Sequence, residues 1–362
     1  MHWNLFKSQQ HKKNYQVNQG RWYLKYPKNR PDFIFSPDRQ LEDLWSQVCT
    51  LSLAKAVGIK VPEVFMVIPM HWERKVKDTK NHIRISASLL SKALVGFEEL
   101  STFYASLIST LQPDDLFEKP ELFLSLLSDE QKKALGKLYA TALWLGHWDL
   151  ANNIDFANAG FQRCEKTGEI NPVIVDGGNA LDEGFHGYRK VETISLFARV
   201  DKENDVQHAQ VDAFELRRFG YDHLSPLSDE VYPFLPRFLF NQKKLFWQDA
   251  KVVDGFVEQS KVISNLKRGD IKESIRQCWY RVVDADGLNR KQSASVLRHA
   301  LKRTKSRWYP GQSNDNILDA LINRANSLRC ITKKIESAKT KGFFDIDSIL
   351  FEDCSNDPAM KC

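Results

Sequence analysis

The chain has 362 residues, of which 42% are hydrophobic and 27% are charged, and its net charge is +6. This composition supports a large hydrophobic core and two or three domains, and it excludes disorder over most of the chain. No stretch approaches the roughly 20 consecutive apolar residues that a membrane-spanning helix needs. The N-terminal sequence also lacks the apolar segment of a secretory signal peptide.

The part of the chain before about residue 90 is expected to be mostly β-strand. Four short β-prone runs carry this expectation, and they comprise residues 15–18, 21–26, 64–68 and 82–90. One helix lies among them over residues 37–57, where apolar side chains recur at helical spacing. Gly58 is placed to end this helix, because glycine easily adopts the left-handed conformation found at helix C-termini.

After residue 90 the pattern becomes helical. Three helices are expected, over residues 97–111, 120–127 and 129–146. The third has the clearest start, because Ser128 is suited to cap its first turn and Asp129 and Glu130 lie at the positive end of its dipole.

A β-hairpin is expected after the third helix, with arms over residues 159–164 and 170–175 and a Lys-Thr-Gly-Glu turn between them. The chain beyond about residue 229 reads as largely helical and basic. The expected order is therefore a small β-rich part with one helix, a helical part, a hairpin and a basic helical part.

The six cysteines are scattered, and no two form a Cys-x-x-Cys pair. They are Cys49, Cys164, Cys278, Cys330, Cys354 and Cys362. This spacing favours the reduced thiols of a cytosolic protein over a zinc site or a disulfide framework.

Three positions have the residue types that phosphoryl transfer requires. The reaction needs metal ions that bridge the phosphates, a cation on the phosphates and a carboxylate that orients the attacking hydroxyl. Lys25 lies in a predicted strand, and Asp149 lies in a His-Trp-Asp-Leu loop at the end of a predicted helix. Asp176 follows a buried-strand run and begins an Asp-Gly-Gly turn.

This succession, together with the Gly-Ile-Lys-Val-Pro-Glu segment at residues 58–63, resembles the HipA-like and lipid-kinase-like branch of the protein-kinase superfamily. It is also similar to the divergent kinase effectors that intracellular bacterial pathogens secrete. The resemblance covers roughly residues 20–184 and implies an α+β, two-lobed protein-kinase-like fold. The implied parts are a β-rich N-lobe over residues 1–93, a helical C-lobe over residues 94–228 and a basic helical C-terminal region over residues 229–362.

The resemblance also implies roles for individual residues, with ATP in the cleft between the lobes. Lys25 would contact the phosphates, Asp149 would orient the acceptor hydroxyl, and Asp176 would hold Mg²⁺ or Mn²⁺. The asparagine that completes the metal site stays open between Asn153 and Asn158, with Asn153 slightly favoured. Asn153 comes one residue before the family's usual spacing from Asp149, and Asn158 lies just before the hairpin strand.

The sequence departs from the family's pattern in two further ways. Gly20 stands alone where the family has a glycine-rich loop over the phosphates. Aligning the chain on Gly58 places Gln47 where the family has the glutamate that pairs with the strand lysine, with Asp43 one turn earlier and Glu42 beside it. Gln47 is therefore a cofactor-site candidate by position, and the ion-pair partner of the lysine stays open.

The positive charge is concentrated in residues 261–310, which contain 13 Lys and Arg against 4 Asp and Glu, a net charge of +9. The other 312 residues sum to −3. Three interpretations stay open: a solvated face, a site for an inositol polyphosphate or for a phosphoinositide on an anionic membrane surface, and, less favoured, a nucleic-acid site. Lys302, Arg303 and Lys305 are the candidate ligand-binding residues of this segment.

These observations favour an ATP-dependent phosphotransferase of atypical kinase type that acts on a protein or lipid hydroxyl, with a polyanion as candidate regulator. A pseudokinase-type scaffold and nucleotidyl transfer on the same fold are the alternatives, because a fold does not determine its chemistry. The expected location is the cytosol, or a host cytosol after secretion without a conventional signal peptide. Peripheral attachment to a membrane is a further expectation.

Overall fold

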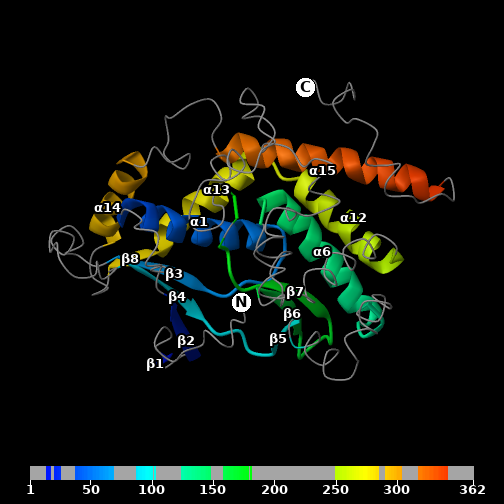
Figure 1. The fold of residues 1–362 in the computed structure, drawn as a ribbon, viewed down its shortest axis with the longest axis horizontal. Coiled ribbons are helices and arrows are strands. Elements are labelled where there is room, and N and C mark those ends of the chain that lie inside the picture. Colours follow the sequence, from blue (N-terminus) through cyan, green and yellow to red (C-terminus); the bar gives the residue numbers. More distant parts are fainter. Residues whose placement is uncertain are drawn as a thin grey trace, which may run out of the picture.

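Over the residues that it describes, the computed structural model shows a mixed α+β protein that is rich in helix and has two small sheets (Figure 1). Among the described residues, those before 41 and the three residues Asp284, Arg290 and Thr340 are described by their backbone alone. The described residues are 14–17, 20–25, 37–68, 87–100, 102, 124–147, 158–178, 180–181, 249–284, 290–303 and 317–340.

The larger sheet has five strands in the order β1-β2-β4-β3-β8. These strands are β1 (Asn14–Val17), β2 (Gly20–Lys25), β4 (Ser88–Lys92), β3 (Val64–Ile68) and β8 (Val282–Asp284). The first four are antiparallel neighbours, as the alternation of short strands indicated, whereas β8 runs parallel to β3. Of the predicted strand over residues 82–90, the structure describes residues 87–90, and three of these, 88–90, lie in β4.

The chain beyond residue 229 is largely helical over its described residues, as predicted, and β8 is the one described strand in it. Val282 pairs with Met66 and is fully buried, so an edge of the N-terminal sheet is completed from the C-terminal part of the chain. The pairing is non-local, and a run of three residues is too short to be recognised from periodicity.

Helix α1 (Pro37–Ala56) covers the five-stranded sheet and confirms the predicted helix over residues 37–57. Leu41, Leu44 and Val48 lie on one stripe at helical spacing and are fully buried. The helix ends as predicted at Gly58, whose φ of 85° allows the amide of Ile59 to donate to the carbonyl of Ala54 at 3.1 Å.

The smaller sheet contains β5 (Phe97–Glu99), β6 (Ala159–Arg163) and β7 (Ile170–Ile174) in that order. The predicted hairpin is confirmed as β6–β7, but the helix expected from residue 97 is wrong at its start, because Phe97–Glu99 is a strand. Gly160 explains the difference: a Cβ there would lie 2.1 Å from the carbonyl oxygen of Glu98, so only glycine lets β5 approach β6 this closely.

Helices α6 (Asp129–Leu145), α12 (Ala250–Ser264) and α15 (Ile317–Thr340) pack against one another and form the helical part seen beside the smaller sheet in Figure 1. The predicted cap of α6 is confirmed, since Ser128 Oγ accepts from the amide of Gln131 at 3.3 Å. Helices α6 and α12 cross at two glycines. A Cβ on Gly136 would lie 2.0 Å from the carbonyl oxygen of Val252, and one on Gly255 would lie 2.0 Å from that of Lys133.

The remaining described helices lie against α1. They are α13 (Arg268–Cys278), the 3-10 turn η3 (Trp279–Arg281) and α14 (Arg290–Arg303). Figure 1 shows α1 between the five-stranded sheet and α13, although the two helices are far apart in the sequence. Among the described helices, none has the length and apolar character needed to cross a bilayer.

One short backbone bridge joins the segment after α1 to the smaller sheet. The amide of Lys60 donates to the carbonyl of Pro172 at 2.9 Å, and the amide of Ile174 donates to the carbonyl of Lys60 at 3.0 Å. This bridge fixes α1 relative to the hairpin that carries the Asp-Gly-Gly turn.

Candidate functional site

The end of α6 places His147 against the Asp-Gly-Gly turn. Gly146 adopts φ 56°, so the chain leaves the helix sharply and the amide of His147 donates to the carbonyl of Ala142 at 2.8 Å. The imidazole of His147 is fully buried, and its Nε2 lies 2.7 Å from the carbonyl oxygen of Asp176. A carbonyl can only accept, so Nε2 carries the proton in this contact.

Helix α15 holds the end of α6 in place. The guanidinium of Arg324, only 6% exposed, donates from Nε to the carbonyls of Leu143 at 2.9 Å and Trp144 at 3.0 Å. In return, the indole of Trp144 donates to the carbonyl of Leu321 at 3.0 Å. The cation therefore satisfies carbonyls in the last turn of α6, at the negative end of its dipole, directly before His147.

Asp176 begins a tight turn that its own side chain stabilises. Its Oδ1 accepts from the amide of Gly178 at 3.0 Å, a local hydrogen bond of the kind that aspartate forms in turns. A Cβ on Gly177 would lie 2.6 Å from the carbonyl oxygen of Gln47 and 3.1 Å from the Cβ of Thr50. Glycine is thus required at position 177 because the backbone of α1 lies directly against the turn.

The side chain of Gln47 is 4% exposed and donates from Nε2 to Asp43 Oδ2 at 2.9 Å. A Cβ on Gly178 would lie 4.0 Å from Gln47 Cδ, so this amide is next to the turn. The structure therefore brings the predicted positions 47 and 176 together. Asp43, one turn earlier on α1, supplies a carboxylate hydrogen-bonded to the amide.

Asn158 lies at the same end of the hairpin as Asp176. Its carbonyl accepts from the amide of Val175 at 3.0 Å, and its side chain is 3% exposed. Carboxylate and amide oxygens suit Mg²⁺ or Mn²⁺, so this pair fits an oxygen-ligand metal site chemically. In the described part of the chain, no three His, Cys, Asp or Glu side chains gather into a metal-binding group, so phosphate oxygens and water would have to supply further ligands.

The structure describes the other predicted site residues only in part. Lys25 is the last residue of β2 and pairs with Leu89, but its side chain is not described. Asp149, Asn153 and Lys305 lie outside the described residues.

Lys302 and Arg303 are exposed in the last turn of α14, a helix that packs against α1 and β8. Arg324 and Thr50 were not predicted from the sequence to support the site. No local pattern marks them, since each acts on a segment more than a hundred residues away.

No protein-family model matches the chain, and no curated protein matches it. Among solved structures, the crystal structure of a Helicobacter pylori proinflammatory kinase, CtkA, is similar with 14% sequence identity. The similarity covers 88% of this chain and 95% of that chain with a TM-score of 0.37. A likeness this distant does not establish a shared fold or a shared activity.

Proposed function

We propose that the chain is an ATP-dependent phosphotransferase of atypical kinase type with a two-lobed fold, acting on a protein or lipid hydroxyl. The observation that carries the proposal is the 2.7 Å contact between His147 Nε2 and the carbonyl oxygen of Asp176. It holds the start of the His-x-Asp loop against the Asp-Gly-Gly turn. Phosphoryl transfer needs such convergence, because the carboxylate that orients the acceptor and the one that binds the metal must face the same phosphate.

In this proposal, Asp176 and Asn158 would hold Mg²⁺ or Mn²⁺, and the metal would supply positive charge to the phosphates of ATP. The Gly178 amide fixes the rotamer of the Asp176 carboxylate, and His147 fixes its backbone. Asp149, two residues after His147, orients the acceptor hydroxyl, and Lys25 contacts the phosphates. We prefer Asn158 over Asn153, because Asn158 directly precedes β6 and its carbonyl accepts from the amide of Val175, the residue before Asp176.

The neutral side chain at position 47 also supports a rival, a pseudokinase-type scaffold. A glutamine cannot form an ion pair with Lys25, and an unpaired strand lysine is less well oriented toward a phosphate. In the proposed phosphotransferase, the carboxylate of Asp43 takes the place of the missing glutamate as the partner of Lys25. Asp43 lies on the same helix as Gln47, and its carboxylate is 2.9 Å from the Gln47 amide.

We further propose that the basic segment, residues 261–310, binds a multiply phosphorylated ligand that regulates the enzyme. Several of its cations already have acidic partners, including Lys261 with Glu336 at 2.6 Å and Arg276 with Glu273 at 2.6 Å. The exposed Lys302 and Arg303 extend the basic surface at the end of α14. A phosphorylated ligand would relieve the repulsion that a net charge of +9 within 50 residues creates.

Purified protein incubated with ATP labelled once at the γ and once at the α phosphate tests the activity. Transfer of the γ label supports the phosphotransferase, transfer of the α label indicates nucleotidyl transfer, and transfer of neither contradicts both in favour of the scaffold. Asp149→Ala is the matched variant: it should retain ATP binding and lose roughly 10²–10⁴-fold in turnover, as expected for an orienting or general-base residue. Unchanged turnover would remove Asp149 from the mechanism.

A further inference from the structure

Two buried cysteines face each other where α1 packs against α13. Cys49 and Cys278 are both fully buried on two helices that pack against each other, and each thiol shifts the pKa of the other. Cys278 Sγ also lies 3.3 Å from the carbonyl oxygen of Ser274 and 3.9 Å from that of Val48, the residue before Cys49. The two thiols are therefore held side by side by the packing of two helices.

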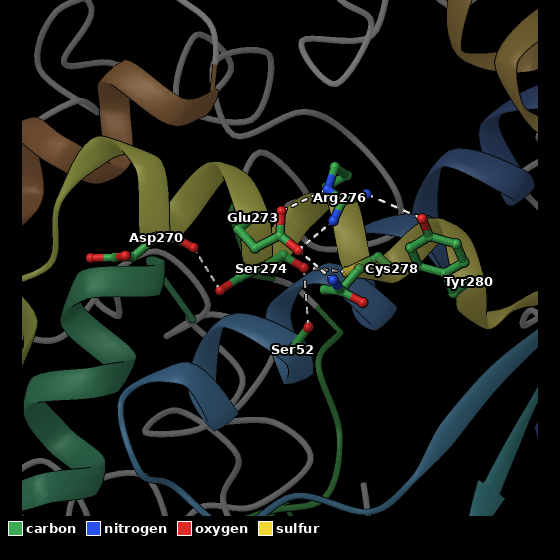
Figure 2. A network of polar contacts seen from close by, with 8 residues as sticks. Ser52, Asp270, Glu273, Ser274, Arg276, Cys278 and Tyr280 are labelled. Atoms are coloured by element: carbon green, nitrogen blue, oxygen red, sulfur yellow. Dashed lines mark hydrogen bonds and ion pairs between the residues drawn. The ribbon is translucent and has the colours of Figure 1, made fainter.

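The surroundings make the two thiols chemically unequal. The neighbouring thiol of Cys49 lowers the pKa of Cys278 against the effect of burial, and Ser52 and the positive charge of Arg281 lower it further. Burial raises the pKa of Cys49 well above its usual range. Figure 2 shows Ser52 on α1 directed toward the α13 segment that contains Ser274 and Cys278, and its hydroxyl lies 3.3 Å from the carbonyl oxygen of Ser274.

A cavity of about 310 Å³ lies beside residues that contact Cys278, although neither cysteine lines it. Three of its lining residues are the ones that act on Cys278: Val48, Ser52 and Arg281. A water molecule occupies about 30 Å³ in the liquid, so the cavity has room for an oxidant of the size of hydrogen peroxide. The thiols are thus shielded from bulk solvent, and the residues around Cys278 separate it from a space that a small neutral oxidant can enter.

We propose that Cys49 and Cys278 are a peroxide-sensitive pair that forms a disulfide between α1 and α13, with Cys278 as the attacking thiol and Cys49 as the resolving thiol. The Cys278 thiolate attacks one oxygen of hydrogen peroxide, the O–O bond breaks, and the departing hydroxide takes up a proton to become water. Cys278 is then a sulfenic acid. The Cys49 sulfur attacks the Cys278 sulfur, the S–O bond breaks, and a second water leaves with the Cys49 proton. Two thiols and one peroxide thereby give one disulfide and two waters.

The position of the link gives it a structural consequence. Helix α1 also carries Gln47 and Thr50, which lie against Gly177 in the Asp-Gly-Gly turn. A covalent bond from Cys49 to α13 would fix the helix on which this turn is seated. Formation of this disulfide does not depend on the proposed phosphotransferase activity.

The test uses the full chain, reduced, freed of reductant and titrated with hydrogen peroxide, then blocked with N-ethylmaleimide and digested without reductant. Mass spectrometry should find the peptides of Cys49 and Cys278 linked, lighter by two hydrogen atoms than the sum of the free peptides and separated by dithiothreitol. Cys49→Ser should leave a sulfenic acid at Cys278 that dimedone traps. Cys278→Ser should leave Cys49 reduced, and Cys164→Ser, a partly exposed control, should leave the link unchanged.

Two results would overturn the proposal. One is the absence of the linked peptide at peroxide concentrations that already oxidise Cys164. The other is a dimedone adduct on Cys49 in Cys278→Ser as readily as on Cys278 in Cys49→Ser. Should a serine variant fail to fold, alkylation of the wild-type chain decides the order of attack: Cys278 should react with iodoacetamide faster than Cys49, and the reverse order contradicts the assignment. All these readouts are masses, so they are independent of any ATP-dependent activity.

Discussion

The helical part formed by α6, α12 and α15 is held together differently from the seat of the Asp176 turn on α1. In the helical part, the backbones of α6 and α12 approach so closely that a Cβ at Gly136 or Gly255 would overlap a carbonyl oxygen. At the seat of the turn, one close approach at Gly177 is combined with single hydrogen bonds from His147 and Gly178. The first region has no room to adjust, whereas the second depends on a few contacts that can change one at a time.

The two regions therefore differ in role: the packed helices α6, α12 and α15 form a rigid platform, and the seat of the Asp176 turn on α1 is the candidate binding site. Helix α6 holds His147 in a fixed position, because Arg324 donates hydrogen bonds to carbonyls in the last turn of this helix. The Asp176 turn is held by contacts on two sides: the hydrogen bond from His147 and the close approach of Gly177 to the backbone of α1. Substitutions in the platform should therefore cost global stability, and substitutions at the seat should cost ligand binding with the fold retained.

The largest effect is expected from Gly136→Ala. The added methyl group would lie 2.0 Å from the carbonyl oxygen of Val252 and force α6 and α12 apart. Overpacking of this kind costs about 3 kcal/mol in the free energy of unfolding. Chemical denaturation measures it, with Gly269→Ala as the matched control, because a Cβ at this helical glycine meets nothing within 4 Å. An equal loss in both variants would show that the close crossing is not what stabilises the platform.

The next effect is the loss of metal-dependent nucleotide binding in Asp176→Ala. The carboxylate is the only charged group of the turn, and without it the metal loses its charge compensation. At a ligand concentration roughly 100 times Kd, bound nucleotide stabilises a protein by about 2.7 kcal/mol. Thermal unfolding with MgATP or MnATP should show this stabilisation in the wild type and not in the variant. An undiminished shift in a folded variant would exclude Asp176 as the metal ligand.

Gly177→Ala should weaken nucleotide binding while the fold is retained. Its methyl group would lie 2.6 Å from the carbonyl oxygen of Gln47, so the turn must move away from α1 and take Asp176 with it. Overpacking in this smaller contact costs about 1 kcal/mol of stability. Titration of MgATP by calorimetry should give a higher Kd than for the wild type. Gly178→Ala is the milder comparison, because its nearest neighbour would be the Asp176 carboxylate at 3.3 Å; a larger loss there would contradict the role given to the α1 contact.

The smallest effect on the free protein is expected from charge reversal at Lys302, Arg303 and Lys305 together. Lys302 and Arg303 are exposed, so the melting temperature without ligand should change little. The variant should lose the rise in melting temperature that inositol polyphosphate or phosphoinositide produces in the wild type at low salt. If nucleic acid but not these ligands stabilises the wild type, the ligand class is wrong. If nothing stabilises it, the segment is a solvated face.

Local sequence signals predicted the elements that make this comparison possible. The start of α6 is marked by Ser128, the end of α1 by Gly58, and the β6–β7 hairpin by its Lys-Thr-Gly-Glu turn, and all three are confirmed. These features depend on hydrogen bonds and backbone conformations within a few residues, so the sequence around each is sufficient to specify it. The roles of Lys25 and Asp149, the three domain ranges and the ligand of the basic segment stay predictions.

The sequence by itself therefore determined which segments fold locally and which residues are candidates for chemistry. Only the tertiary structure decided how they meet: that β8 completes the N-terminal sheet, that Phe97–Glu99 is a strand, and that Cys278 lies against Cys49. It also decided that α1 presses on Gly177. Each of these contacts joins residues far apart in the chain, and its energy comes from pairing and close packing that exist only once the helices and sheets have assembled.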